Sequence, residues 1–233
     1  MGKTRPYHHA GLRDALLAEA LRSLERDGIS SLSLRAMAES LGVSKTAPYR
    51  HFEDKQALLV AISAEGFRML ADALEGAVVN ESQSAPRPGA GAHPTVVSAA
   101  SAVVDLVRVY LEFSRAHPAL YRLMFSPLGY SLHSESCRAN ATRAFAALMK
   151  VVEHAQAAGW RAEQSVPALA LSVWAQAHGW AGLINDELIP EEMRGQPVEP
   201  TLLVESLVGG EQRREQPQIH PRPISRTTDF SVD

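Results

Sequence analysis

Apolar residues along most of the chain recur at intervals of three and four positions, the spacing that places them on one face of an α-helix. In the first such stretch Leu16, Ala20 and Leu24 share a face. The sequence has no run in which β-branched residues alternate with polar ones, and it has no internal repeat. The pattern therefore predicts an all-α fold.

Glycines and helix-capping residues divide the N-terminal part of the chain into short helices. A first helix over about 12–26 is expected to end at Gly28, because glycine readily adopts the left-handed conformation that terminates helices. A second is expected to end at Gly42, a third at about His51, and a fourth to follow. Side chains that can accept hydrogen bonds from the free N–H groups of a helix precede the second, third and fourth helices: Ser33, Ser44 and Asp54.

The second and third helices, joined by the turn 41–44, have the form of a helix-turn-helix unit. The second helix of such a unit can enter the major groove of DNA, which is wide enough for one helix. Here it carries hydrogen-bond donors and amphipathic side chains, and neighbouring residues could meet phosphates. The candidate DNA contacts are Ser33, Arg35, Ser44, Lys45, Thr46, Tyr49, Arg50, His51 and Lys55.

The periodicity alone leaves two points open. Two helices of a bundle with a solvated polar face would show the same spacing. Pro48 has no backbone N–H, so the third helix is expected to start either at Ser44 or slightly later, with Thr46 as its cap.

The run 42–59 strongly resembles the DNA-binding segment of TetR/AcrR-type transcriptional regulators. That family shows Gly-Val-Ser, then Tyr-x-His-Phe, then Lys and Leu at this spacing, and the likeness covers about residues 10–60. The sequence departs from the family pattern at Pro48, where Leu, Ile or Phe is more usual. The resemblance implies that the groove and backbone contacts are Lys45, Thr46, Tyr49 and His51, with Lys55 on a phosphate.

The resemblance also implies a domain organisation. A three-helix, helix-turn-helix DNA-binding domain would cover 10–56, and a helical ligand-binding and dimerisation domain would cover 57–208, linked by the helix after Asp54. The segment 80–95 is rich in Pro and Gly and is expected to be a loop, and the polar segment 209–233 a disordered tail. The remaining helices are expected over about 103–113, 118–125, 134–158, 166–188 and 200–208.

Two stretches of the C-terminal part, 117–125 and 174–180, resemble a TetR C-terminal sub-type named for its Trp-His-Gly (WHG) signature. Trp174 and His178 are four residues apart, so they lie on one helix face. A pocket there would gain apolar area from the indole and a hydrogen bond from the imidazole. The alternatives are a hydrogen-bonded core histidine and a helix–helix dimer contact. The candidate ligand-binding residues are Tyr110, Phe113, Met124, Trp174 and His178.

Composition narrows the partners. The net charge of −3 excludes a uniformly basic nucleic-acid coat, but residues 1–55 carry +2 and the rest −5, which favours a polyanion at the N-terminal end. The only cysteine, Cys137, excludes an intrachain disulfide and suits a reducing cytoplasm. The histidines lack metal-ligand spacing, so neither a metal nor another cofactor is expected. Residues 165–185 carry no charge and are assigned to a buried or interface helix rather than a membrane span.

The leading hypothesis is a DNA-binding transcriptional regulator, a repressor in the usual case, that binds double-stranded operator DNA as a homodimer and releases it when a small-molecule effector binds. The alternative is a helical homodimeric protein-interaction module without DNA binding. An enzyme is disfavoured, because 129–133 lacks the second glycine of a nucleophile elbow and 89–91 lacks the third glycine of a dinucleotide loop.

Overall fold

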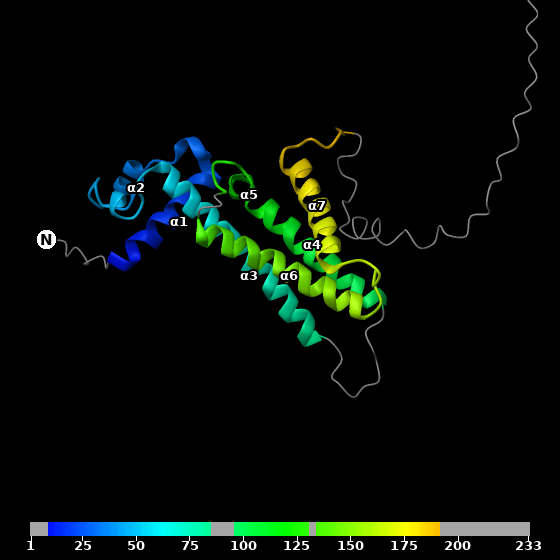
Figure 1. The fold of residues 1–233 in the computed structure, drawn as a ribbon. Coiled ribbons are helices and arrows are strands. Elements are labelled where there is room, and N and C mark those ends of the chain that lie inside the picture. The colour runs from blue at the N-terminus through cyan, green and yellow to red at the C-terminus, as the bar shows by residue number, and fades with distance from the viewer. Residues whose placement is uncertain (1–8, 85–95, 131–133, 192–233) are drawn as a thin grey trace, which may run out of the picture.

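The computed structural model describes residues 9–84, 96–130 and 134–191, and within these ranges the fold is entirely helical, as predicted. The elements form a small N-terminal unit at one end and a bundle of longer helices beyond it (Figure 1). In chain order they are α1 (His9–Asp27), the 3₁₀ turn η1 (Ile29–Ser31), α2 (Leu34–Ser40), the 3₁₀ turn η2 (Pro48–Arg50), α3 (Lys55–Ser84), α4 (Val96–Ala116), α5 (Pro118–Met124), α6 (Glu135–Ala157) and α7 (Val166–Asn185).

The N-terminal unit, called the head below, is built from α1, α2, η2 and the start of α3. Two predicted caps are confirmed: the Ser33 hydroxyl accepts from the Ala36 N–H, and the Asp54 carboxylate accepts from the Ala57 N–H at 2.7 Å. The helices bury a common apolar core, so each short helix is stable only in the company of the others. This core includes Leu16, Leu24, Leu34, Met37, Phe52 and Leu58.

The third predicted helix is wrong. Residues 45–47 form turns, and only the single 3₁₀ turn η2 follows them. The reason is Pro48, which has no N–H to offer the Ser44 carbonyl; that carbonyl accepts from the Ala47 N–H at 2.9 Å instead. Neither Ser44 nor Thr46 caps η2, whose N-cap is Ala47, and the two hydroxyl groups bond to each other at 3.3 Å.

The C-terminal bundle is organised around α3, which starts in the head and continues along α6 (Figure 1). Helix α4 packs on both α3 and α6, α7 packs on α4 and α6, and α5 packs on α3 and also on α1 of the head. The Arg143 guanidinium of α6 forms an ion pair with Glu75 of α3 at 2.6 Å. Helix α3 therefore belongs to the cores of both parts of the chain.

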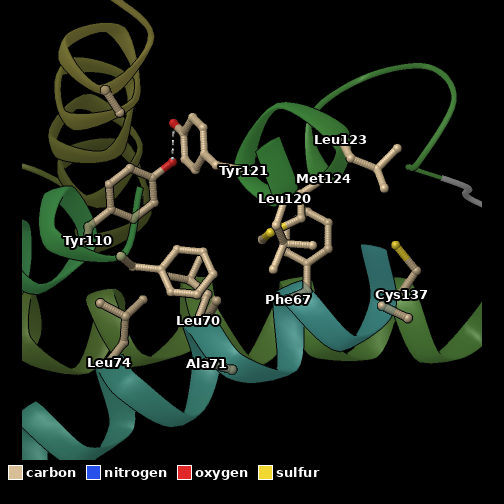
Figure 2. Packing of buried hydrophobic residues seen from close by; sticks show 14 of the residues in the cluster. Phe67, Leu70, Ala71, Leu74, Tyr110, Leu120, Tyr121, Leu123, Met124 and Cys137 are labelled. Carbon is tan, nitrogen blue, oxygen red and sulfur yellow. Dashed lines mark hydrogen bonds between the residues drawn. The ribbon is translucent and has the colours of Figure 1, made fainter. Parts of the chain in front are cut away.

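Helix α5 lies especially close to α3. A Cβ atom on Gly66 would come within 2.6 Å of the Met124 sulfur and 2.9 Å of a Leu120 methyl group. Figure 2 shows Leu120, Leu123 and Met124 of α5 gathered beside Phe67 of α3. Only glycine allows this approach, so α5 cannot move toward α3 without displacing it.

Several predicted boundaries shift. The break expected from residue 80 begins later, because α3 continues to Ser84, and the rest of the expected loop, 85–95, lies outside the described residues. Helix α7 ends at Asn185 rather than near 188, where Glu187 takes a left-handed conformation with φ of 55°. The expected helix 200–208 and tail 209–233 also lie outside the described residues. No described helix is both long and apolar enough to cross a membrane.

Candidate DNA-binding and ligand-binding sites

The segment after α2 presents polar side chains outward from a buried anchor. Pro48 and Phe52 are buried in the head, whereas Lys45, Thr46, Tyr49 and Arg50 are exposed, Tyr49 to 54%. We call the exposed set the recognition surface: Lys45, Thr46, Tyr49 and Arg50. Because the tight turn is anchored at these two buried residues, the backbone that carries the exposed side chains has little freedom to move.

The other candidate DNA contacts surround this surface. Ser33 is engaged as the cap of α2, and Arg35 is exposed in the first turn of that helix. His51 is half-buried. Lys55 donates from Nζ to the Ile29 carbonyl at 2.9 Å, so it ties η1 to α3, and an ammonium group has two further donors for a phosphate.

Sequence reasoning missed one cationic residue near this surface. The Arg13 guanidinium of α1 lies 5.5 Å from the centroid of the Phe52 ring, an arrangement in which a cation is attracted to the aromatic face. The contact fixes α1 against the segment that follows η2. Its partners are distant in sequence, and no local pattern indicates it.

The bundle contains a pocket of about 450 Å³. Its wall includes Phe67 and Leu70 of α3, Tyr110 of α4, Phe145 and Leu148 of α6 and Trp174 of α7, and the segment after α5 closes it with Phe125, Ser126, Pro127 and Tyr130. A pocket of this size suits a small organic ligand. Helix α3, which the bundle shares with the head, is one of the helices that line this pocket.

Of the five predicted ligand-binding residues, Tyr110 and Trp174 line this pocket. His178 lies behind the wall, half-buried, and bonds to the tyrosines there. Phe113 is buried against His117, with ring centroids 5.1 Å apart, and Met124 is buried against Gly66. Phe113 and Met124 therefore support the wall from the core.

A hydrogen-bonded group of aromatic side chains stands at one side of the pocket. The Trp174 indole N–H donates to the Tyr110 hydroxyl at 3.4 Å, and that hydroxyl lies 3.0 Å from the Tyr121 hydroxyl (Figure 2). His178 Nδ1 is 2.7 Å from the Tyr121 hydroxyl and 3.0 Å from that of Tyr110. His178 is therefore a hydrogen-bonded histidine that lies at the edge of a pocket. This combines two of the interpretations that the sequence left open, the hydrogen-bonded core histidine and the pocket residue.

Burial keeps this group uncharged. Desolvation raises the pKa of Tyr110 to about 12 and raises the pKa of Tyr121 further, and it lowers the pKa of His178. Both tyrosines and the histidine are thus neutral at physiological pH. A neutral His178 can accept from the Tyr121 hydroxyl, which matches their short separation.

The lowered pKa of His178 predicts a pH effect on stability. Below about pH 6.5 the unfolded chain protonates this histidine and the folded chain resists, so unfolding becomes easier as pH falls from neutral toward the lowered folded pKa. We expect the melting temperature of His178→Gln to fall less than that of the wild type between neutral and mildly acid pH. His154→Gln, on the exposed face of α6, should show the same fall as the wild type. Thermal unfolding across this range, followed by circular dichroism, measures both. A His178→Gln profile parallel to that of the wild type would contradict the prediction.

Two side chains of the head, Glu25 and Gln56, form hydrogen bonds to the segment 118–130, which consists of α5 and the residues after it. The Glu25 carboxylate of α1 accepts from the Ala119 and Leu120 N–H groups at 3.2 and 3.0 Å, in the first turn of α5. The Gln56 side chain, in the first turn of α3, donates to the Leu128 carbonyl at 2.7 Å. The segment that closes the pocket is therefore bonded directly to the head, which the sequence pattern did not indicate.

Helix α7 has an outer face without a partner among the described residues. Leu171 and Leu183 are 53% and 43% exposed, and between them lie the small exposed residues Ala175 and Gly179. A Cβ on Gly179 or Gly182 would meet no atom within 4 Å. This strip of apolar and small residues carries no charge, and its open glycines leave room for another helix to approach closely.

Comparisons with known proteins agree with this division. Residues 16–62 match the family described as bacterial regulatory proteins, tetR family, and residues 103–194 match the tetracyclin repressor-like, C-terminal domain. The tetracycline repressor protein class C of Escherichia coli is 39% identical over 75 residues, which are 32% of this chain and 30% of that repressor. The chain thus matches less than a third of that repressor's length.

Solved structures resemble the chain over most of its length. A protein of unknown function from Rhodococcus sp. RHA1 is 32% identical with a TM-score of 0.68, covering 88% of this chain and 96% of that one. The TetR family transcriptional regulator PfmR from Thermus thermophilus shares the fold, with 19% identity and a TM-score of 0.51 over 82% of this chain and 93% of that one.

Proposed function

The chain belongs to the TetR family of bacterial regulatory proteins and is a DNA-binding transcriptional regulator, and from this premise we propose that it is a repressor that a small molecule releases from its operator. The observation that carries the proposal is the shared use of α3 and of segment 118–130. Both help to form the pocket. Helix α3 begins in the head, and segment 118–130 is bonded to the head through Gln56 and Glu25. We propose further that it acts in the cytoplasm, where bacterial DNA lies.

The DNA-binding domain is proposed to cover 10–56 and to place the recognition surface in the major groove. Tyr49 and Thr46 would contact base edges, whereas Lys45 and Arg50 would hold the register on the phosphates. Ser33, Arg35, Ser44, His51 and Lys55 would make the surrounding backbone contacts. The exposure of the recognition surface supports these roles.

The ligand-binding and dimerisation domain is proposed to cover 57–208, with the WHG signature contributing Trp174 and His178 to the pocket region. Two copies would pair through α6 and the outer face of α7. One recognition turn reads only a few base pairs, so we expect a near-palindromic operator whose half-site centres are roughly 34–36 Å apart or a little more.

The single experiment that tests the proposal selects the fragments that the full chain binds from its own genomic DNA. A near-palindromic motif is the expected result, and the genes beside it supply effectors to test for release. The alternative function, a helical protein-interaction module, predicts no selected motif and no salt-dependent duplex binding.

Substitutions in the recognition surface separate sequence choice from general attraction. Tyr49→Ala is expected to weaken operator binding by about 1–3 kcal/mol and to relax base preference, the usual cost of a lost base-edge contact. Lys45→Ala is expected to weaken binding to all duplexes alike and to lower the slope of log affinity against log salt by about one. Fluorescence anisotropy with operator and scrambled duplexes at several salt concentrations measures both effects.

The control for these titrations is Ala162→Ser, in the exposed turn after α6 and outside both the recognition surface and the proposed dimer helices. It should leave both affinity and salt slope unchanged. If Tyr49→Ala keeps the affinity and preference of the wild type, the recognition surface does not read the bases.

A further inference from the structure

The wall of the pocket is almost wholly apolar. Aromatic rings and aliphatic side chains from α3, α4, α6 and α7 face it, and no Asp, Glu, Lys, Arg or His is among the described residues that line it. A charged group entering such a pocket would lose its hydration and find no opposite charge, which costs several kcal/mol or more. The pocket therefore selects against ions.

The polar groups of Ser126, Tyr110 and Trp174 in the wall already have protein partners. The Ser126 hydroxyl donates to the Leu123 carbonyl at 2.8 Å and accepts from the Gly129 N–H at 3.2 Å. The Tyr110 hydroxyl lies within hydrogen-bond distance of the Trp174 indole, the Tyr121 hydroxyl and His178. Apolar area must therefore supply most of the binding free energy of a ligand.

The size and the rings of the pocket narrow the ligand further. An engineered apolar cavity of roughly 150 Å³ takes up benzene. The pocket of about 450 Å³ scales from this to about 18 non-hydrogen atoms. Phe67 packs edge-on against Phe125 and Tyr130, and Phe145 packs edge-on against Trp174. The centroids of the Phe125 and Trp174 rings are 6.4 Å apart, so a connected set of aromatic rings borders the pocket and offers both edges and faces to a ligand.

We infer that the pocket binds an uncharged, mainly apolar molecule built on linked or fused aromatic rings, of about 18 non-hydrogen atoms. The inference rests on the proposed function, in which this pocket is the effector site. It adds the chemical class of the effector. It excludes charged ligands such as nucleotides, acyl thioesters and amino acids, and strongly polar ones such as sugars.

Two fluorescent probes that differ by one charge test the class. N-phenylnaphthylamine is neutral, consists of linked aromatic rings and brightens in apolar surroundings, and anilinonaphthalene sulfonate adds a sulfonate to the same skeleton. We expect the full chain to bind the neutral probe at least about tenfold more tightly than the anion, since an unpaired buried charge is costly. Equal affinity for both probes, or no binding of the neutral probe, would overturn the inference.

Two substitutions on α6 place the probe in the pocket. Ala144→Phe fills the cavity from a buried position and is expected to abolish binding of the neutral probe. Ala141→Lys introduces a cation at a half-buried position of the wall, where the long stem can reach water, and is expected to reverse the preference toward the anion. Ala162→Lys, in the exposed turn after α6, is the matched control and should keep the preference of the wild type.

Circular dichroism confirms that each variant is folded before its titration is interpreted. If Ala144→Phe does not fold, Ala141→Lys still decides the site, because position 141 is only half-buried and leaves the lysine stem a path to water. A wild-type preference that survives Ala141→Lys would overturn the pocket as the binding site. Operator affinity measured with the neutral probe bound separates the two proposals. If the probe binds with the expected pattern but operator affinity does not change, the ligand class is supported and the proposed regulatory role is contradicted.

Discussion

Gly179→Glu is expected to convert the proposed dimer into monomers and to weaken operator binding by more than about a hundredfold. The outer face of α7 is uncharged and open at this position, so the new carboxylate fits the single chain without touching any atom within 4 Å of its Cβ. Replacing glycine inside a helix also favours the helical conformation by about 1 kcal/mol. In a paired face each copy would bury an unpaired charge, at a cost of several kcal/mol, and about 1.4 kcal/mol corresponds to a tenfold change in affinity.

Light scattering at micromolar concentration measures the oligomeric state, and anisotropy with the operator duplex measures the consequence. Ala162→Glu adds the same charge at an exposed turn and should remain dimeric with unchanged affinity. A Gly179→Glu protein that stays dimeric and binds the operator normally would place the dimer interface elsewhere. Circular dichroism of the Gly179→Glu protein distinguishes loss of pairing from loss of folding: a monomer that keeps the helical content of the wild type and unfolds cooperatively has lost only its partner.

Helical periodicity and capping chemistry were sufficient to predict the fold class and most elements of the head. Ser33 and Asp54 cap the helices that follow them because their side-chain oxygens accept hydrogen bonds from N–H groups that have no partner inside the helix. The third helix could not be predicted correctly from the same rules. A periodic run containing Pro48 keeps its buried anchors even when the missing N–H reduces the helix to a 3₁₀ turn.

The pocket shows where sequence reasoning stops. Tyr110 and Trp174 were predicted from their residue type and spacing, yet Phe67, Leu70 and Phe145 have the same helical spacing as ordinary core residues. Met124 has that spacing too, and it fills the gap left by Gly66 instead of facing the pocket. Which apolar residues border a cavity depends on how α3, α4, α6 and α7 leave the space between them unfilled, and no single helix contains that information.

The contacts between the head and segment 118–130 explain how a ligand could change DNA binding. Glu25 bonds two of the free N–H groups at the start of α5, a helix whose N-cap His117 makes no side-chain cap bond. At its other end the segment reaches the pocket through Phe125 and Ser126. Arg122 of α5 also pairs with Asp186 at the end of α7, at 2.8 Å. A ligand that moves this segment therefore pulls on α1 and α7 together.

Glu25→Ala is expected to reduce the effect of the effector on operator affinity while leaving each binding event intact. Glu25 lines neither the pocket nor the recognition surface, and single changes along a coupling network alter the coupling by about 0.5–2 kcal/mol, roughly 2- to 30-fold. The measurement is operator affinity with and without saturating effector, repeated for Gln56→Ala and for the double variant. Glu163→Ala, in the exposed turn after α6, is the control. Because coupling is reciprocal, the same factor must appear in effector affinity with and without operator DNA. If the double variant keeps the wild-type factor, segment 118–130 does not carry the signal, and α3 alone must transmit it to the recognition surface.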